Sequence, residues 1–238
     1  SDLPAYRFRV RTNVTEDSGS IRVAGKLLEY RLWRGKSAPD HLLVLLHQGL
    51  GCVSTWRDFP ARLAALTGCT VLTYSRLGHG ASERATLPRA PTFMHDEALS
   101  ALPMVIEHFA HRRLWLIGHS DGASIAVIYA GSEPRPTLAG VVLMAPHVFV
   151  EEETLAGIRA TACSYRNGVL RERLARHHGA QVDEMFWGWN QVWLSGSFAD
   201  WNIESYLSGI GVPVATIQGE ADPYGTLAQL EAIDAGCG

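Results

Sequence analysis

The sequence has few cysteines, little excess charge and no long hydrophobic run. Its 238 residues include four cysteines, scattered and without a C-x-x-C pair, which argues against a disulfide framework. The formal net charge of −3 argues against a nucleic-acid-binding surface, which needs clustered Lys and Arg. No apolar run approaches membrane-spanning length, and the first residues show no signal-peptide pattern. We predict a cytoplasmic protein that acts on a small molecule, with no nucleic-acid or membrane partner and no metal or cofactor.

Short apolar runs alternate with helical patterns through most of the chain. The apolar runs, typical of strands buried on both faces, cover residues 42–46, 71–74, 114–117, 141–144 and 213–217. Helical patterns follow them over residues 55–66, 94–109, 122–131 and 226–234. Apolar and polar residues alternate over residues 6–35, which predicts two antiparallel strands with a turn near residues 18–19. This order predicts an α/β fold with a doubly wound, mainly parallel sheet.

One segment interrupts this alternation. Residues 150–207 are helical in pattern, rich in aromatic side chains and without a strand signal. We therefore predict three parts, namely an α/β core over residues 1–146, a helical cap over residues 147–208 and a return to the core over residues 209–238. The aromatic cap is expected to shape a largely apolar pocket, with Trp187 and Trp193 as candidate substrate-binding residues.

The strongest local signal is Gly-His-Ser-Asp-Gly at residues 118–122, between a strand pattern and a helix pattern. It fits G-x-S-x-G, in which the serine sits on a sharp turn that projects its hydroxyl out of the sheet. The two glycines remove side chains that would clash in so tight a turn. The start of the helix places positive backbone dipoles near a developing oxyanion. We predict that Ser120 is a catalytic nucleophile.

Acyl transfer also needs backbone N–H groups that face the developing oxyanion. One donor is expected from Asp121, the residue after the nucleophile, and the other from the loop after an earlier central strand. That loop holds Gly49, which we select as the second donor, with Gln48 and Leu50 as alternatives.

A carboxylate and a histidine should complete a catalytic triad. Where this turn occurs in a sheet of this kind, the acid follows the nucleophile and the histidine comes last. Asp222, with Glu220 close by, follows the strand pattern at 213–217 and can hold an imidazole in the required tautomer. None of the 16 residues after Asp222 is a histidine. We therefore expect the final strand and helix, about 25–40 residues by average element lengths, to lie beyond this sequence with the histidine. We also expect this polypeptide to be impaired in activity.

Other histidines are alternatives for the base. His147 follows a central strand, His119 adjoins the nucleophile, and His47 and His79 lie in loops after strands. None of them has the expected place in the chain order, so we do not predict that one replaces the missing residue.

These motifs resemble those of the α/β-hydrolase superfamily over essentially the whole chain. The sequence is most similar to the group of meta-cleavage-product hydrolases and small esterases. The resemblance rests on His-Gln-Gly-Leu-Gly at 47–51, Arg-Leu-Gly-His-Gly-Ala-Ser at 76–82 and the turn around Ser120. It implies a serine hydrolase that cleaves a small ester or related acyl compound through an acyl-enzyme. Haloalkane dehalogenases and epoxide hydrolases share the fold but use an aspartate nucleophile, so Ser120 argues against both.

Three alternatives stay open at this point. Carbon–carbon bond hydrolysis of the meta-cleavage type uses the same triad. A small-molecule-binding protein without turnover can also be built on this scaffold, and the missing histidine favours it. One branch of the superfamily shares Ser-Asp-Gly at the nucleophile, and its aspartate helps to receive a substrate amino group. Asp121 therefore either binds a cationic substrate through its carboxylate or contributes only its backbone N–H.

Overall fold

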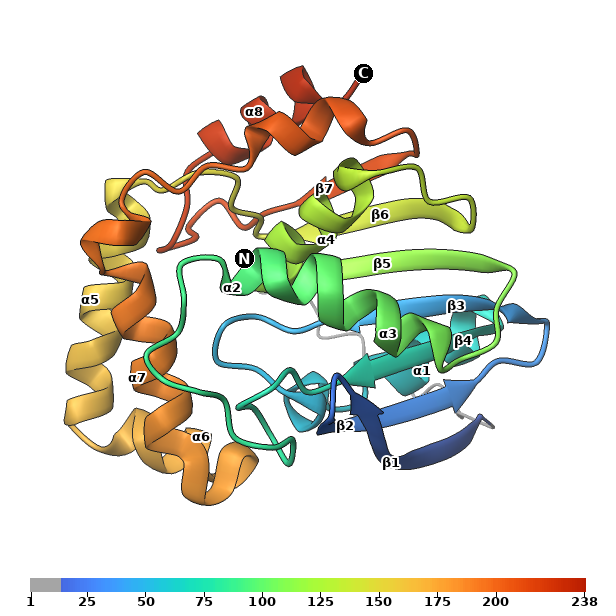
Figure 1. The fold of residues 1–238 in the computed structure, drawn as a ribbon, viewed down its shortest axis with the longest axis horizontal. Coiled ribbons are helices and arrows are strands. Elements are labelled where there is room, and N and C mark those ends of the chain that lie inside the picture. Colours follow the sequence, from blue (N-terminus) through green and yellow to red (C-terminus); the bar gives the residue numbers. More distant parts are fainter. Residues whose placement is uncertain (1–13) are drawn as a thin grey trace, which may run out of the picture.

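The computed structural model describes residues 14–238, which form one seven-stranded sheet with helices on both faces (Figure 1). The strand order is β1-β2-β4-β3-β5-β6-β7. The strands are β1 (Thr15–Val23), β2 (Lys26–Arg34), β3 (Ala38–Leu46), β4 (Cys69–Tyr74), β5 (Arg113–His119), β6 (Leu138–Met144) and β7 (Val214–Ile217). β3 to β7 run parallel, while β1 and β2 add an antiparallel hairpin at one edge. The predicted doubly wound, mainly parallel sheet is confirmed.

The turn of the first hairpin differs from the prediction. It lies at Ala24 and Gly25, which both have positive φ angles of 45° and 81°. A two-residue turn of this kind matches the twist of the flanking strands. Gly19, predicted to be in the turn, instead lies within β1 opposite Tyr30, where a Cβ would come within 3.2 Å of the tyrosine ring. Residues 6–13 of the predicted hairpin lie outside the described residues.

The helical patterns of the core are confirmed, with small changes at their ends. The core elements are η1 (Val53–Trp56), α1 (Phe59–Thr67), α2 (Phe93–Asp96), η2 (Glu97–Ala101), α3 (Leu102–Glu107), α4 (Asp121–Ser132) and α8 (Ala228–Gly236). α4 follows the predicted nucleophile directly and is buried on nearly every side. A helix that is apolar all round needs such a central place, and this place makes α4 a rigid support for Ser120.

The aromatic segment folds into helices beyond the carboxyl ends of the parallel strands (Figure 1). These are α5 (Glu152–Arg166), α6 (Val169–His178), η3 (Gly179–Gln181) and α7 (Val182–Trp193), followed by η4 (Gly196–Phe198) and η5 (Glu204–Gly209). η5 returns to the core and packs closely on α4: a Cβ on Gly131 would lie 1.9 Å from the Tyr206 carbonyl oxygen, and one on Gly209 would lie 2.3 Å from that of Gly131. The predicted boundaries of the cap remain a prediction.

Hydrogen bonds fasten this helical segment to loops of the core. His178 Nδ1 accepts the N–H of Gly80 at 3.0 Å, so its Nε2 carries the proton and donates to the carbonyl of Leu50 at 3.0 Å. Gln181 Nε2 donates to the carbonyls of Gly80 at 2.7 Å and Ser82 at 3.1 Å. Within residues 14–238, no helix combines the length and the apolar character needed to cross a bilayer.

Candidate active site

Ser120 occupies a strained turn between β5 and α4. Its φ and ψ angles are 52° and −119°, in a region that residues other than glycine rarely adopt. The flanking glycines are sterically required. A Cβ on Gly118 would lie 2.3 Å from the carbonyl oxygen of Gly122, and one on Gly122 would lie 2.1 Å from that of Leu46. The Ser120 N–H donates to the carbonyl of Met144 at 2.9 Å, which ties the turn to β6.

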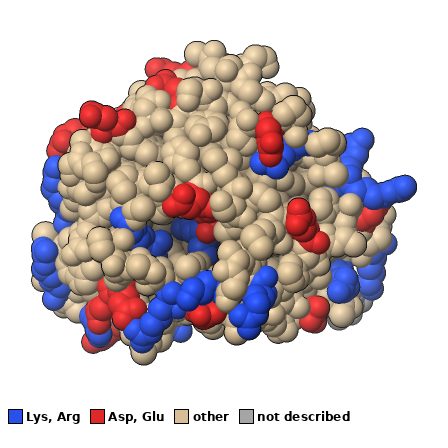
Figure 2. Space-filling view, viewed as in Figure 1, with Lys and Arg blue, Asp and Glu red and all other residues tan. Residues whose placement is uncertain are grey.

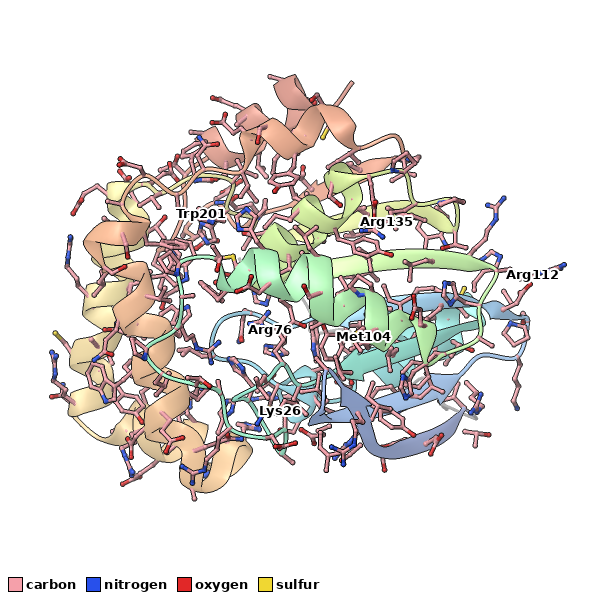
Figure 3. The ribbon with its side chains drawn as sticks, in the orientation of Figure 1. Lys26, Arg76, Met104, Arg112, Arg135 and Trp201 are labelled. Carbon is pink, nitrogen blue, oxygen red and sulfur yellow. The ribbon has the colours of Figure 1, made fainter. Side chains whose placement is uncertain are left out.

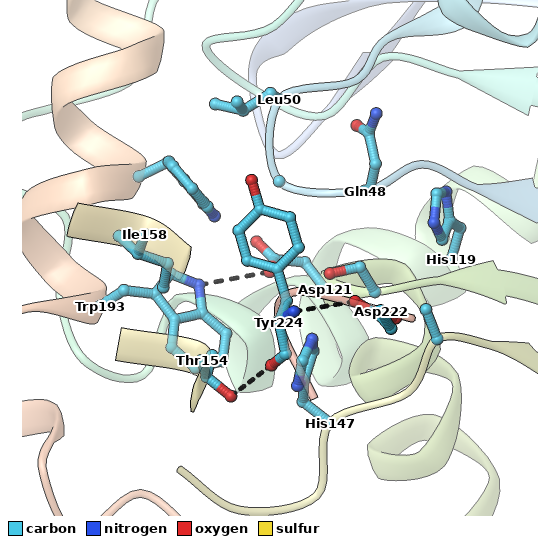
Figure 4. A pocket seen from close by; sticks show the side chains of 14 residues that line it. Gln48, Leu50, His119, Asp121, His147, Thr154, Ile158, Trp193, Asp222 and Tyr224 are labelled. Carbon is cyan, nitrogen blue, oxygen red and sulfur yellow. Dashed lines mark hydrogen bonds between the residues drawn. The ribbon is translucent and has the colours of Figure 1, made fainter. Parts of the chain in front are cut away.

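A cavity of about 230 Å³ opens onto Ser120 (Figure 4). Its walls come from the loop after β3, the nucleophile turn, helices α5 and α7, and the loop after β7. Five of the predicted site residues line it together, namely Gly49, Ser120, Asp121, Trp193 and Asp222. Residues up to 173 positions apart in the chain thus meet at the carboxyl ends of the strands, where open α/β sheets bind their ligands.

The sixth predicted residue, Trp187, does not line this cavity. Its ring packs edge-on against Tyr165 and Phe186, with centroid distances of 5.6 and 5.0 Å, and the Arg166 guanidinium lies 5.1 Å above it. Trp189 lines the cavity instead. The sequence holds a signal for this, because Trp189 and Trp193 are four residues apart and therefore share one face of a helix.

The loop after β3 is held by its carbonyl groups. Arg76 Nη1 donates to the His47 carbonyl at 2.7 Å, and Arg76 Nη2 donates to the Gln48 carbonyl at 3.2 Å. His79 Nε2 lies 3.1 Å from the Gly49 carbonyl. In a trans peptide the N–H points opposite to the C=O. The N–H of Gly49, in the same peptide as the Gln48 carbonyl, is therefore directed away from Arg76. The choice of Gly49 over Gln48 and Leu50 as an oxyanion donor stays a prediction.

The Asp121 side chain is buried and faces protein groups. Trp193 Nε1 donates to its Oδ1 at 3.3 Å (Figure 4). Arg76 Nη2 lies 3.9 Å from its Oδ2. Burial raises the pKa of this carboxyl, while Arg76 opposes the rise. The carboxylate is thus already placed between an indole N–H and a guanidinium, whereas its backbone N–H begins α4.

Two histidines share the cavity with Asp222, which lies in the loop after β7. Burial lowers the pKa of His147 to about 4, although the attraction of Asp222 opposes this. Burial likewise lowers the pKa of His119, again against Asp222. Asp222 Oδ1 accepts the N–H of Tyr224 at 2.9 Å. Within residues 14–238, no hydrogen bond joins the Ser120 hydroxyl to a histidine, and no group of three His, Cys, Asp or Glu side chains could hold a metal ion.

Comparison with known proteins identifies the family. A family model described as alpha/beta hydrolase fold matches residues 41–202. The chain belongs to this family. The α/β-hydrolase is 28% identical to human monoglyceride lipase over 152 residues, which are 63% of this chain and 49% of the lipase. It is 33% identical to the sn-1-specific diacylglycerol lipase of Danio rerio over 121 residues, 50% of this chain and 36% of that one.

The chain spans about half the length of the first curated relatives that it matches. Among solved structures, the enol-lactonase from Burkholderia xenovorans LB400 superposes with a TM-score of 0.68 at 19% identity, covering 92% of this chain and 88% of that one. At this identity the likeness supports the fold alone. The match to the family model confirms the resemblance of the sequence to the α/β-hydrolase superfamily.

Proposed function

We propose that this α/β-hydrolase is a serine hydrolase that cleaves a small ester or related acyl compound through an acyl-enzyme at Ser120. The observation that carries the proposal is the strained turn that presents Ser120 at the floor of a cavity, next to the N terminus of α4. A serine held in this conformation only for packing would not need an opening toward solvent. The lipases among the relatives are consistent with ester hydrolysis.

In the proposed reaction, the Ser120 hydroxyl attacks the acyl carbonyl and loses its proton to a histidine base. The N–H groups of Gly49 and Asp121 stabilise the oxyanion of the tetrahedral intermediate. The leaving alcohol takes the proton from the histidine, and an acyl-enzyme remains. Water then attacks this ester by the same route, releasing the acid and free Ser120.

The proposal assigns the base to a histidine from outside residues 14–238, oriented by Asp222. His147 and His119 line the cavity, but neither is hydrogen-bonded to Ser120 within the described residues. Burial lowers the pKa of both rings, which makes each a weaker base than an ordinary imidazole. A base supplied by a further segment fits the position of Asp222 in the loop after the sheet's edge strand.

The cavity favours a small and largely apolar acyl group. Its volume of about 230 Å³ lies below the usual range for drug-sized ligands, about 300–1,000 Å³. Apolar side chains from three elements line it, namely Leu50, Ile158, Trp189 and Trp193. We therefore propose acetyl to butyryl esters as better substrates than long-chain glycerides.

Activity-based labelling tests the proposal. A fluorophosphonate probe should label the chain extended past Gly238, and that protein should release p-nitrophenol from p-nitrophenyl butyrate. Ser120→Ala should abolish both, while Ser100→Ala, at an exposed serine of η2, should leave both unchanged. Absence of labelling in the extended, folded protein would contradict the proposal.

A ligand-binding protein without turnover is the second candidate, and it is favoured because no histidine among residues 14–238 is hydrogen-bonded to the Ser120 hydroxyl. This candidate expects a small acyl compound to bind in the cavity with an affinity that Ser120→Ala leaves unchanged. Titration calorimetry of both proteins with butyramide, together with the labelling experiment, separates the candidates. Binding with neither labelling nor turnover would support the second one.

A further inference from the structure

A second cavity, of about 430 Å³, is lined by Arg76 and by other residues, none of which lines the cavity at Ser120. It is enclosed by the β1–β2 hairpin, the segment from Ala85 to Ala90, and the α2–η2 helix. Figure 2 shows an opening near the middle of this face with basic side chains inside it, at the position where Figure 3 labels Arg76. Among the described residues, none that lines this cavity is hydrogen-bonded to Ser120 or Asp121, and Arg76 Nη2 lies 3.9 Å from Asp121 Oδ2, beyond hydrogen-bonding distance.

The cavity combines apolar walls with charged groups at its inner end. Leu28, Leu77 and Phe93 contribute to the walls, and Arg76, Arg89 and Glu97 contribute the charges. Lys26 and the exposed Asp96 also line it, nearer the surface, with one charge of each sign. A ligand that fits this lining has an apolar body and one charged end.

Arg89 is a charged group of this cavity that has no hydrogen-bond or ion-pair partner within residues 14–238. Its Nε and Nη2 atoms are buried without a hydrogen-bond partner, and no ion pair involves it within residues 14–238. These two nitrogens pack against Gly188 and Gly78, where a Cβ would lie 3.0 Å from Nε and 3.3 Å from Nη2, and neither glycine lines the cavity. Nη1 is not buried in this way. An anion in the cavity would contact Arg89 there and balance a charge that no ion pair within residues 14–238 balances.

Arg76 adds a second positive charge. Its Nε is also buried and unpaired, and its other nitrogens hold the loop after β3. Burial, followed by repulsion from Arg76, lowers the pKa of Arg89 to about 10. Two guanidinium groups that repel each other in this way are held more favourably when an anion lies between them.

The two nearby carboxyl groups balance these charges only in part. Glu97 Oε1 accepts the Tyr74 hydroxyl at 2.5 Å, and burial raises the pKa of Glu97. Asp121 lies 3.9 Å from Arg76 and makes its hydrogen bond to Trp193. Neither carboxylate is hydrogen-bonded to Arg89 among the described residues.

We propose that this second cavity binds a small apolar carboxylic acid, whose carboxylate lies at Arg89 and Arg76 and whose apolar part lies against Leu28 and Phe93. A carboxylate suits the site because one of its oxygens can accept a charge-assisted hydrogen bond from Arg89 Nη1. The apolar walls distinguish such an acid from inorganic anions. Binding in this cavity does not require chemistry at Ser120, so the binding proposal and the proposed hydrolysis can fail independently of each other.

Titration calorimetry with sodium hexanoate tests the site. The protein and the Arg112→Gln variant, whose substitution is exposed at the opposite end of the sheet (Figure 3), should bind hexanoate equally. Arg89→Gln should weaken binding at least tenfold. Hexanamide, which has the same shape without the charge, and inorganic phosphate should each bind at least tenfold more weakly than hexanoate. Equal binding of hexanoate to the protein and to Arg89→Gln, or of phosphate and hexanoate, would overturn the assignment.

Glu97→Gln should change the affinity for hexanoate in the opposite direction to Arg89→Gln. It removes a negative charge from the cavity and keeps an oxygen that can accept the Tyr74 hydroxyl, so hexanoate should bind several-fold more tightly. Damage to the fold cannot produce a gain in affinity, which keeps the test informative if Arg89→Gln folds poorly. Weaker or unchanged binding by folded Glu97→Gln would overturn the proposed arrangement of charges.

Discussion

Replacing Gly49 by alanine perturbs the loop after β3, the source of one proposed oxyanion donor, at the point where α7 covers it. A Cβ at this position would lie 2.1 Å from Nε1 and 2.4 Å from Cδ1 of Trp189. Ordinary contacts of a Cβ begin near 3.4 Å. The indole or the loop must therefore move by roughly 1.3 Å, the difference between 3.4 and 2.1 Å.

Both partners are held in place, so this movement is costly. The carbonyl groups on either side of Gly49 are bound by Arg76 and His79. Trp189 is buried against Phe186, with ring centroids 5.9 Å apart. Overpacking of such a site destabilises a protein by about 1–3 kcal/mol. Displacement of one oxyanion donor lowers kcat by about 10²–10³-fold.

A double-mutant cycle measures this conflict. Urea unfolding should show that Gly49→Ala costs about 1–3 kcal/mol in the parent protein and much less in a Trp189→Ala background, where the indole is gone. Gly211→Ala is the matched control, because no atom lies within 4 Å of a Cβ there. Equal costs of Gly49→Ala in both backgrounds would show that Gly49 does not lie beneath Trp189 as described. Unchanged esterase activity in folded Gly49→Ala would remove Gly49 as an oxyanion donor.

Three further perturbations have defined outcomes. Burial lowers the pKa of His147 from an unfolded value near 6.5 to about 4. The neutral ring therefore contributes fully to the free energy of unfolding above pH 6.5, and up to ~3 kcal/mol is lost as the pH falls toward 4. A His147→Gln variant should show a shallower loss of stability in urea melts, and an equally steep loss would contradict this. Tyr74→Phe leaves the buried Glu97 carboxyl without its hydroxyl donor and should lower the unfolding free energy by about 1–3 kcal/mol, whereas Tyr30→Phe, the control, should change it little. His178→Phe removes two hydrogen bonds between the cap and the core and should lower both Tm and turnover; an unchanged Tm would show that these bonds do not fasten the cap.

The strands and helices were predictable because each has a local cause. The apolar runs at 71–74 and 114–117 are buried on both faces in β4 and β5, as parallel strands require. The hairpin turn was misplaced because Ser18 and Gly19 have turn-forming residue types, while Ala24 and Gly25 actually adopt the positive φ angles. Pairing with β2 decides between the two positions, and that pairing is not visible in a local window.

The candidate site was predictable where a backbone conformation demands a residue type. Gly118 and Gly122 can be read from the sequence because any side chain there would collide with the backbone. The choice of Trp187 failed because aromatic composition alone does not say which face of a helix meets the cavity, and a four-residue spacing selects Trp189 with Trp193. Arg89 was missed because nothing in its sequence neighbourhood shows that its partners would be left out of the fold.

The loop after β3, which holds the proposed oxyanion donor Gly49, depends on both the core and the cap for its position. Arg76, His79 and His178 together bind the carbonyls of four successive residues, 47 to 50. Arg76 and His79 come from the loop after β4, but His178 comes from the end of α6 in the cap. The position of the Leu50 peptide therefore depends on the docking of the cap. Movement of α6 away from the core would release the Leu50 carbonyl alone, because the carbonyls of residues 47 to 49 are bound by Arg76 and His79 of the core.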